Sequence, residues 1–150
     1  MFKKILFPLD LTENIYRVLP YVIEMADKFG AEIHCVYSLY VTAYYGSMGM
    51  GGTYVGEFEI NAFNEVKARM DKFVSESFEG RNVQTSILNG RPGNKIVDYA
   101  NENDIDLIIM GHSTTGIERA MIGSVAAHVV KYSPSPVLVV SPEVLSEKSE

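Results

Sequence analysis

Apolar residues follow two different spacings along this chain of 150 residues. Short, mostly apolar runs predict strands that are buried on both faces of a sheet. Segments with apolar residues every three or four positions predict helices with one buried face. The predicted strands are residues 4–8, 31–39, 83–88, 106–110 and 136–140, and the predicted helices are residues 14–29, 58–78, a short helix after the turn at 91–94, and 123–132.

Strands and helices alternate along the whole chain, and this order predicts an α/β protein. Such alternation is typical of a mainly parallel, Rossmann-like open sheet of five strands with helices on both faces. Residues 1–142 form the predicted domain, and residues 143–150 are a charged C-terminal tail. In the second strand, we interpret His34 as an ordinary strand residue near the edge of the sheet.

Residues 40–56 interrupt this order with a Tyr-, Gly- and Met-rich insertion. Its glycine density argues against a regular helix. The stretch is also too apolar for an inert linker. We interpret it as a segment that folds over a ligand or a second subunit, with a plain loop as the alternative.

Composition narrows the class of protein. The formal net charge is −6, which argues against nucleic acid as a partner because phosphate backbones favour basic surfaces. No apolar run approaches the roughly 20 residues of a membrane span, and we expect a cytoplasmic protein without a membrane partner. The single cysteine, Cys35, lies in an apolar run and is interpreted as a small buried hydrophobe.

The candidate site lies at the carboxyl ends of the predicted strands, where open α/β sheets bind ligands. Pro8, Leu9 and Asp10 follow the first strand. The Asp10 carboxylate can accept hydrogen bonds from sugar hydroxyls or help to hold a metal ion; equally, it can cap the next helix. We interpret the segment from Gly90 to Gly93, after the third strand, as turn chemistry only.

The segment from Gly111 to Ser124 carries the most chemistry. Gly111 follows the fourth strand directly and allows close approach to the backbone. Ser113 begins a run of hydroxyl side chains, and Gly123 and Ser124 open a helix whose free N–H groups and dipole favour an anion. The alternative is a turn, a helix start and a spacer without a ligand.

Several separated motifs resemble the universal stress protein family over almost the whole chain. They read KILFPLDLTE, GAEIHCVYSL, NGRPGNKIVDYA, DLIIMGHSTTG and IGSVAAHVVKYSPSPVLVV. The resemblance implies the adenine nucleotide alpha-hydrolase-like fold, with strand order 3-2-1-4-5 and a crevice between strands one and four. It also implies binding of ATP or another adenine nucleotide there, with or without Mg²⁺.

The chain departs from the family pattern G-x-x-G, nine residues, G-[S/T] in two ways. Thr114 stands where the second glycine is expected, and the spacing from Gly111 to Gly123 is one residue shorter. This resembles a subgroup whose shortened loop often reads G-x-H-R-P; Ser113 and Thr114 replace its histidine and arginine. We therefore expect weakened nucleotide affinity.

The resemblance implies a role for each matching position. Adenine would lie near Ser38, and the ribose near the Pro8–Asp10 segment and Gly111. The phosphates would lie over Ser113, Gly123, Ser124 and Val125, and Ala126 is also among the expected cofactor-binding residues. The family also implies a homodimer through the last strand, Val137–Val140, and a paired edge strand would avoid aggregation.

Three functions remain open on the sequence. The first is a stress-response regulator that binds an adenine nucleotide, and the second is a dimeric interaction module of the same fold without a nucleotide. The third is an enzyme such as a slow ATPase, which the residues support little because no catalytic constellation is evident. A redox flavoprotein is a more remote alternative.

Overall fold

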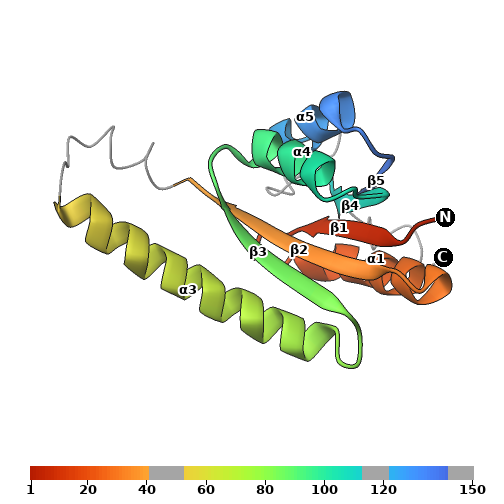
Figure 1. The fold of residues 1–150 in the computed structure, drawn as a ribbon, viewed down its shortest axis with the longest axis horizontal. Coiled ribbons are helices and arrows are strands. Elements are labelled where there is room, and N and C mark those ends of the chain that lie inside the picture. Colours follow the sequence, from red (N-terminus) through yellow and green to blue (C-terminus); the bar gives the residue numbers. More distant parts are fainter. Residues whose placement is uncertain (41–52, 113–121, 142–150) are drawn as a thin grey trace, which may run out of the picture.

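The computed structural model describes residues 1–40, 53–112 and 122–141. Strands and helices alternate in these ranges, as the apolar spacing predicts (Figure 1). The strands are β1 (Lys4–Pro8), β2 (Glu32–Leu39), β3 (Val83–Asn89), β4 (Leu107–Gly111) and β5 (Val137–Val140). The helices are α1 (Ile15–Phe29), α3 (Thr53–Ser77), α4 (Pro92–Glu102) and α5 (Ser124–Tyr132).

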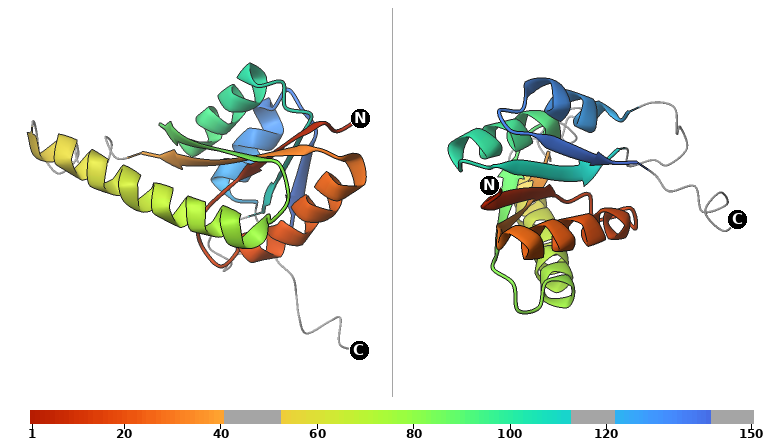
Figure 2. Two further views of the ribbon diagram at one scale, coloured as in Figure 1. Left: turned by 60° about the horizontal axis from the view of Figure 1, so that its bottom comes forward. Right: turned by 90° about the vertical axis from the view of Figure 1, so that its right-hand side faces the viewer.

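The five strands form one parallel sheet in the order β3-β2-β1-β4-β5, which confirms the predicted fold class and strand order. Helices α1 and α3 cover one face, and α4 and α5 cover the other (Figure 2). The strand order reverses direction at β1, because β2 lies on one side of it and β4 on the other. A crevice for ligands is expected at this reversal point.

The central strand β1 supplies both cores in alternation. Phe7 belongs to the core cluster under α1 and α3, whereas Leu6 belongs to the cluster under α4 and α5. Both side chains are almost fully buried, and burial of each contributes roughly 1.5–3 kcal/mol. A strand that is buried on both faces must be apolar throughout, which is why its sequence shows no alternation.

Helix α3 begins earlier than predicted. It starts at Thr53 and includes Gly56, so residues 53–56 of the predicted insertion are helical. A single glycine costs only about 1 kcal/mol in a helix interior, and a helix already formed downstream extends readily over it. The rest of the insertion, residues 41–52, lies outside the described residues, as does the tail at 143–150. Figure 1 shows the N-terminal half of α3 extending beyond the sheet.

The interpretation of His34 as a residue near the sheet edge is wrong. His34 lies on β2, which pairs with strands on both sides, and β3 forms the edge. The side chain is 2% exposed, with Nδ1 at 2.7 Å from the Tyr99 hydroxyl and Nε2 paired with Glu32. Burial raises the pKa of Tyr99. The histidine thus joins β2 to α4 through satisfied polar contacts inside the core.

The prediction for Cys35 can be read directly from burial. Cys35 is fully buried, and burial raises the pKa of its thiol to about 12, which confirms a small hydrophobe in place of a reactive thiol. Among the helices that the structure describes, none combines the length and the apolar character needed to cross a membrane.

Candidate functional site

A cavity of about 490 Å³ opens where the carboxyl ends of β1 and β4 separate. The two strands pair at Ile5–Leu107 and Leu6–Ile108, and the residues that follow them line the cavity from opposite sides. Its volume lies in the range of small-molecule sites. The cavity therefore stands at the reversal point of the sheet, where the topology predicts a ligand.

Nine of the ten predicted site residues line this single cavity, although they come from three strand ends and one helix start. They are Pro8, Leu9, Asp10, Ser38, Gly111, Gly123, Ser124, Val125 and Ala126. The tenth, Ser113, lies outside the described residues, as does Thr114. The fold thus brings these nine residues together around one cavity. Their contact with a ligand remains a prediction.

The first wall of the cavity is the loop between β1 and α1, residues 9–14. The Leu9 amide donates to the Val36 carbonyl at 2.8 Å, and the Thr12 amide donates to Asp10 Oδ1 at 3.0 Å. Leu11 between them has a left-handed backbone, with φ of 56°. The Asp10 carboxylate thus braces its own loop at Thr12, two residues before the helix cap at Asn14, and it retains acceptor positions for a ligand.

The second wall is the N-terminus of α5. Gly123 is the N-cap residue in an extended conformation, and its amide donates to the His112 carbonyl at 2.8 Å. The first intrahelical bond at this end runs from the Ala127 amide to the Gly123 carbonyl. The N–H groups of the first three helical residues, Ser124 to Ala126, therefore have no acceptor within the helix. Together with the helix dipole, they favour an anion.

The end of β2 closes the third side. The Ser38 hydroxyl donates to the Gly90 carbonyl at 2.7 Å and joins β2 to the turn before α4. Because the Ser38 hydroxyl already donates its proton to Gly90, a ligand would bind Ser38 mainly through the backbone or by donating to the hydroxyl oxygen. The floor between the walls is apolar and includes Val36, Ile96 and Met110.

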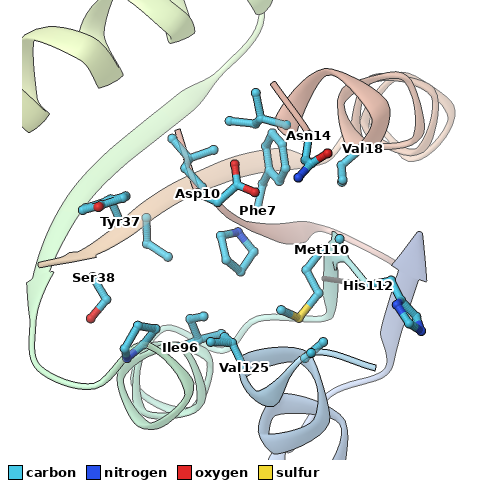
Figure 3. A pocket seen from close by; sticks show the side chains of 18 of the residues that line it. Phe7, Asp10, Asn14, Val18, Tyr37, Ser38, Ile96, Met110, His112 and Val125 are labelled. Atoms are coloured by element: carbon cyan, nitrogen blue, oxygen red, sulfur yellow. The ribbon is translucent and has the colours of Figure 1, made fainter. Parts of the chain in front are cut away.

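Figure 3 shows two opposite sides of the cavity. Asp10, Asn14 and Phe7 lie on one side, while Ile96, Met110 and Val125 lie opposite. Among the lining residues that the structure describes, Asp10 is the only carboxylate, and there is no lysine or arginine. The cavity therefore has an acceptor at one wall and amide donors at the other.

His112 lines the cavity but sits beside β5 in Figure 3. Its amide donates to the Val140 carbonyl at 2.9 Å, so its backbone closes the β4–β5 edge. Its Nδ1 is buried without a hydrogen-bond partner in the described part of the chain. Within the same ranges, no group of three His, Cys, Asp or Glu side chains could hold a metal ion.

The interpretation of residues 90–93 as a simple turn is only partly right. Gly90 does adopt a positive φ of 143°, as a turn glycine can. Pro92, the first residue of α4, lines the cavity. A Cβ at Gly93 would lie 2.9 Å from the His128 ring, so this glycine permits α4 to pack closely against α5.

Sequence reasoning did not identify several lining residues. Val18 comes from α1 and Ile96 from α4, and the apolar spacing of these helices already accounts for both as buried residues. Asn14, Tyr37 and Met110 also line the cavity. Position is a signal for two of them, because Tyr37 and Met110 lie within two residues of the ends of β2 and β4.

Comparison with known proteins agrees with this architecture. The sequence model described as "Universal stress protein family" matches residues 1–141. A universal stress protein of Methanocaldococcus jannaschii, MJ0531, is 33% identical over 142 residues, which cover 93% of this chain and 82% of that protein. The solved structure of MJ0577, from the same organism, superimposes with a TM-score of 0.81 at 27% identity and covers 96% of this chain and 99% of that one.

Two more distant structures share the fold and were solved with nucleotides. A universal stress protein in complex with cAMP has a TM-score of 0.64 at 19% identity, covering 93% of this chain and 97% of that one. A universal stress protein from Archaeoglobus fulgidus in complex with dAMP has a TM-score of 0.59 at 22% identity, covering 93% and 98%. The fold, the near-complete match to the family's sequence model and the relatives agree, and this chain therefore belongs to the universal stress protein family.

Proposed function

We propose that this protein binds an adenine nucleotide in the β1/β4 cavity and acts as a nucleotide-dependent stress-response regulator. The observation that carries the proposal is the opposed chemistry of the two walls. A carboxylate acceptor at Asp10 faces the cavity on one side, and the free amides at Ser124, Val125 and Ala126 begin α5 on the other. A nucleotide has hydroxyl donors on its ribose and an anion on its phosphate, so it complements both walls.

The proposed orientation follows from this complementarity. The adenine ring packs on the apolar floor beside Val36 and the Ser38 backbone. The ribose hydroxyls donate to Asp10, close to Pro8 and Leu9, and the phosphate accepts from the α5 amides next to Gly111 and Gly123. The cAMP and dAMP complexes of proteins with this fold support the choice of an adenine ligand.

The absence of lysine and arginine from the described lining supports an expectation of modest affinity. A phosphate held by neutral amides alone has fewer charge-assisted hydrogen bonds than one held by an arginine. Mg²⁺ bound to the phosphates of ATP would offset part of the negative charge near Asp10. We therefore expect ATP to bind more tightly with Mg²⁺ than without it.

Isothermal titration calorimetry with AMP and with ATP, each with and without Mg²⁺, tests the proposal. Saturable binding of one molecule per chain at micromolar to millimolar ligand is the expected result. Mass spectrometry of small molecules released on denaturation provides an independent measurement. No binding heat at millimolar ligand, together with no released nucleotide, would contradict the proposal and favour the alternative of an interaction module without a nucleotide.

We further propose a homodimer through β5. This strand is an edge of the described sheet, and Leu138, Val130 and Tyr132 are exposed on it and on the neighbouring α5. Pairing of Val137–Val140 with a second copy would cover that edge. A Leu138→Lys variant should shift the mass measured by light scattering from a dimer to a monomer, and an unchanged dimer would exclude this edge. We also propose that the protein is located in the cytoplasm.

A further inference from the structure

The first wall of the cavity contains a strained residue. Leu11 has a φ of 56°, and Asp104 is the only other non-glycine residue with positive φ in the described ranges. This left-handed conformation is unfavourable for a residue with a Cβ. Such outliers persist only where the surroundings hold them, and they gather at functional sites. The contacts that hold Leu11 are therefore informative.

Two of those contacts come from the loop and the core. The Leu11 side chain packs against the core cluster under α1 and α3. The next amide, of Thr12, donates to Asp10 Oδ1 at 3.0 Å. The carboxylate that faces the cavity is thus tied to the residue directly after the strained one.

The third contact comes from a distant part of the chain. Arg69 Nη2, on α3, donates to the Leu11 carbonyl oxygen at 2.6 Å, across 58 residues of sequence. A hydrogen bond from a guanidinium is stronger than one between neutral groups. Arg69 lies on a turn of α3 beside the buried Met70, so the helix that presents it is anchored to the sheet.

We propose that Arg69 is a positioning residue of the ligand site. It holds the Leu11 carbonyl, keeps the loop in its strained form and thereby keeps the Asp10 carboxylate at the cavity. This hydrogen bond joins helix α3 to the loop that carries Asp10, although the described lining contains no residue of α3. The role in ligand binding rests on the proposed function, whereas the effect on the loop does not.

Lys67 provides a matched control on the same helix. It is exposed and pairs with Asp71 on α3 itself, at 3.0 Å, rather than with the loop. Arg69→Ala and Lys67→Ala each remove one positive charge and replace a long side chain by the best helix former. A difference between the two variants therefore reports the contact with Leu11.

The first experiment measures amide hydrogen exchange by NMR on the ligand-free protein. In Arg69→Ala, exchange at the Thr12 amide should accelerate about tenfold relative to the wild type, because the loop opens more often. Lys67→Ala should leave this rate unchanged, and Arg69→Lys, which can still donate to the carbonyl, should fall between. An unchanged Thr12 rate in Arg69→Ala overturns the proposal.

The second experiment measures AMP binding by calorimetry at a temperature well below unfolding. Arg69→Ala should raise the dissociation constant for AMP about fivefold, and Lys67→Ala should leave it unchanged. Adding Leu11→Asn to Arg69→Ala should recover part of the loss, since asparagine tolerates the left-handed region better than leucine. A lowered melting temperature with an unchanged dissociation constant would mean that Arg69 only stabilises the fold, and it would overturn the role in binding.

The two experiments separate the proposals. If the wild-type protein binds neither AMP nor ATP, the proposed function fails. In that case the exchange rate at Thr12 still decides whether Arg69 holds the loop. If AMP binds and Arg69→Ala binds it as tightly as the wild type, the proposed function stands and the positioning role of Arg69 fails.

Discussion

The two walls of the cavity are built in different ways. The β1–α1 loop presents a side-chain acceptor, Asp10, and has Leu11 in a strained conformation. It is held by its own bond from Thr12 to Asp10 and by contacts with β2 and α3. The α5 wall presents backbone amides, which are fixed in place by the helix itself once Gly123 caps it. One wall thus depends on long-range contacts, whereas the other depends on local helix geometry.

This difference teaches how each wall should respond to mutation. The α5 amides cannot be removed by changing a side chain, so they are sensitive mainly to bulk that blocks access. The loop can be weakened gradually, through Asp10 itself or through the residues that hold it. The walls also differ in charge, because a carboxylate attracts hydroxyl donors and a helix N-terminus attracts anions. Adenosine and AMP, which differ only in the phosphate, can therefore separate the two contributions.

The largest effect is expected for Gly123→Val. A branched side chain at the N-cap adds bulk to the lining next to the free amides, so AMP binding should become undetectable by calorimetry. Adenosine binding should change much less, since adenosine has no phosphate. Valine is also a poor N-cap, and urea unfolding should show a loss of about 1 kcal/mol with the fold retained. Equal losses for AMP and adenosine would contradict a phosphate site at this wall.

A smaller effect is expected for Asp10→Ala. Loss of a charged acceptor from the ribose hydroxyls should weaken both AMP and adenosine by about tenfold, in keeping with about 1.4 kcal/mol for such a hydrogen bond. Asp10→Asn keeps one acceptor oxygen and should lose less. Tighter AMP binding in Asp10→Ala would mean that the carboxylate only repels the phosphate, and the assignment of the first wall would be wrong.

Gly111→Ala tests the floor between the walls. A Cβ there would meet Val18 Cγ2 at 3.5 Å, an ordinary contact, and the backbone has no positive φ. The described fold should therefore accept alanine, with a change in unfolding free energy within about 0.5 kcal/mol. A methyl group in the cavity lining should still weaken AMP binding by about threefold. An unchanged affinity would indicate that the ligand does not approach Gly111 closely.

The smallest effect on ligand binding is expected for Arg81→Ala, because Arg81 does not belong to either wall of the cavity. The Arg81 guanidinium donates two hydrogen bonds to Asp27, at 2.8 and 2.9 Å, and these hydrogen bonds hold the pKa of that carboxyl below its ordinary value. A lowered pKa stabilises the folded state above the unfolded value, and the contribution is lost as the pH falls through the folded value. Because the pair is exposed, the wild type should melt only slightly above the variant at pH 7. This difference should shrink as the pH falls below the ordinary pKa of that carboxyl, and it should vanish once the pH lies below the lowered pKa of Asp27 in the folded state. AMP affinity at pH 7 should not change. A change in AMP affinity would show that the cavity responds to any loss of charge, and would remove the contrast between the walls.

Much of the cavity could be predicted because its residues follow strand ends. Pro8 ends β1, Leu9 and Asp10 follow it, and Gly111 ends β4, so knowledge of the strand order is enough to bring them together. The glycine before an apolar helical run also predicts the start of α5. These features depend on neighbours in the sequence, which a pattern of apolar and polar residues records directly.

Other features depend on contacts between distant residues, and no pattern recorded them. The sequence pattern predicted only a strand residue at His34, and its contact with Tyr99 forms when β2 packs against α4. The extension of α3 to Thr53 overrides a glycine-rich composition, because helix growth is cooperative. The 58-residue separation between Arg69 and Leu11 has no signature in either segment.

The sequence by itself thus determined the alternation of strands and helices, the apolar core strands, and the polar groups of the two cavity walls, which are Asp10 and the N-terminus of α5. Each of these follows from burial or backbone chemistry that acts within a few residues. Only the tertiary structure decided which helix residues line the cavity and that Arg69 holds the loop carrying Asp10. The physical reason is that such contacts form only when helices and strands pack together. Packing brings together residues that are far apart in the sequence, and a local pattern of apolar and polar residues contains no information about such pairs.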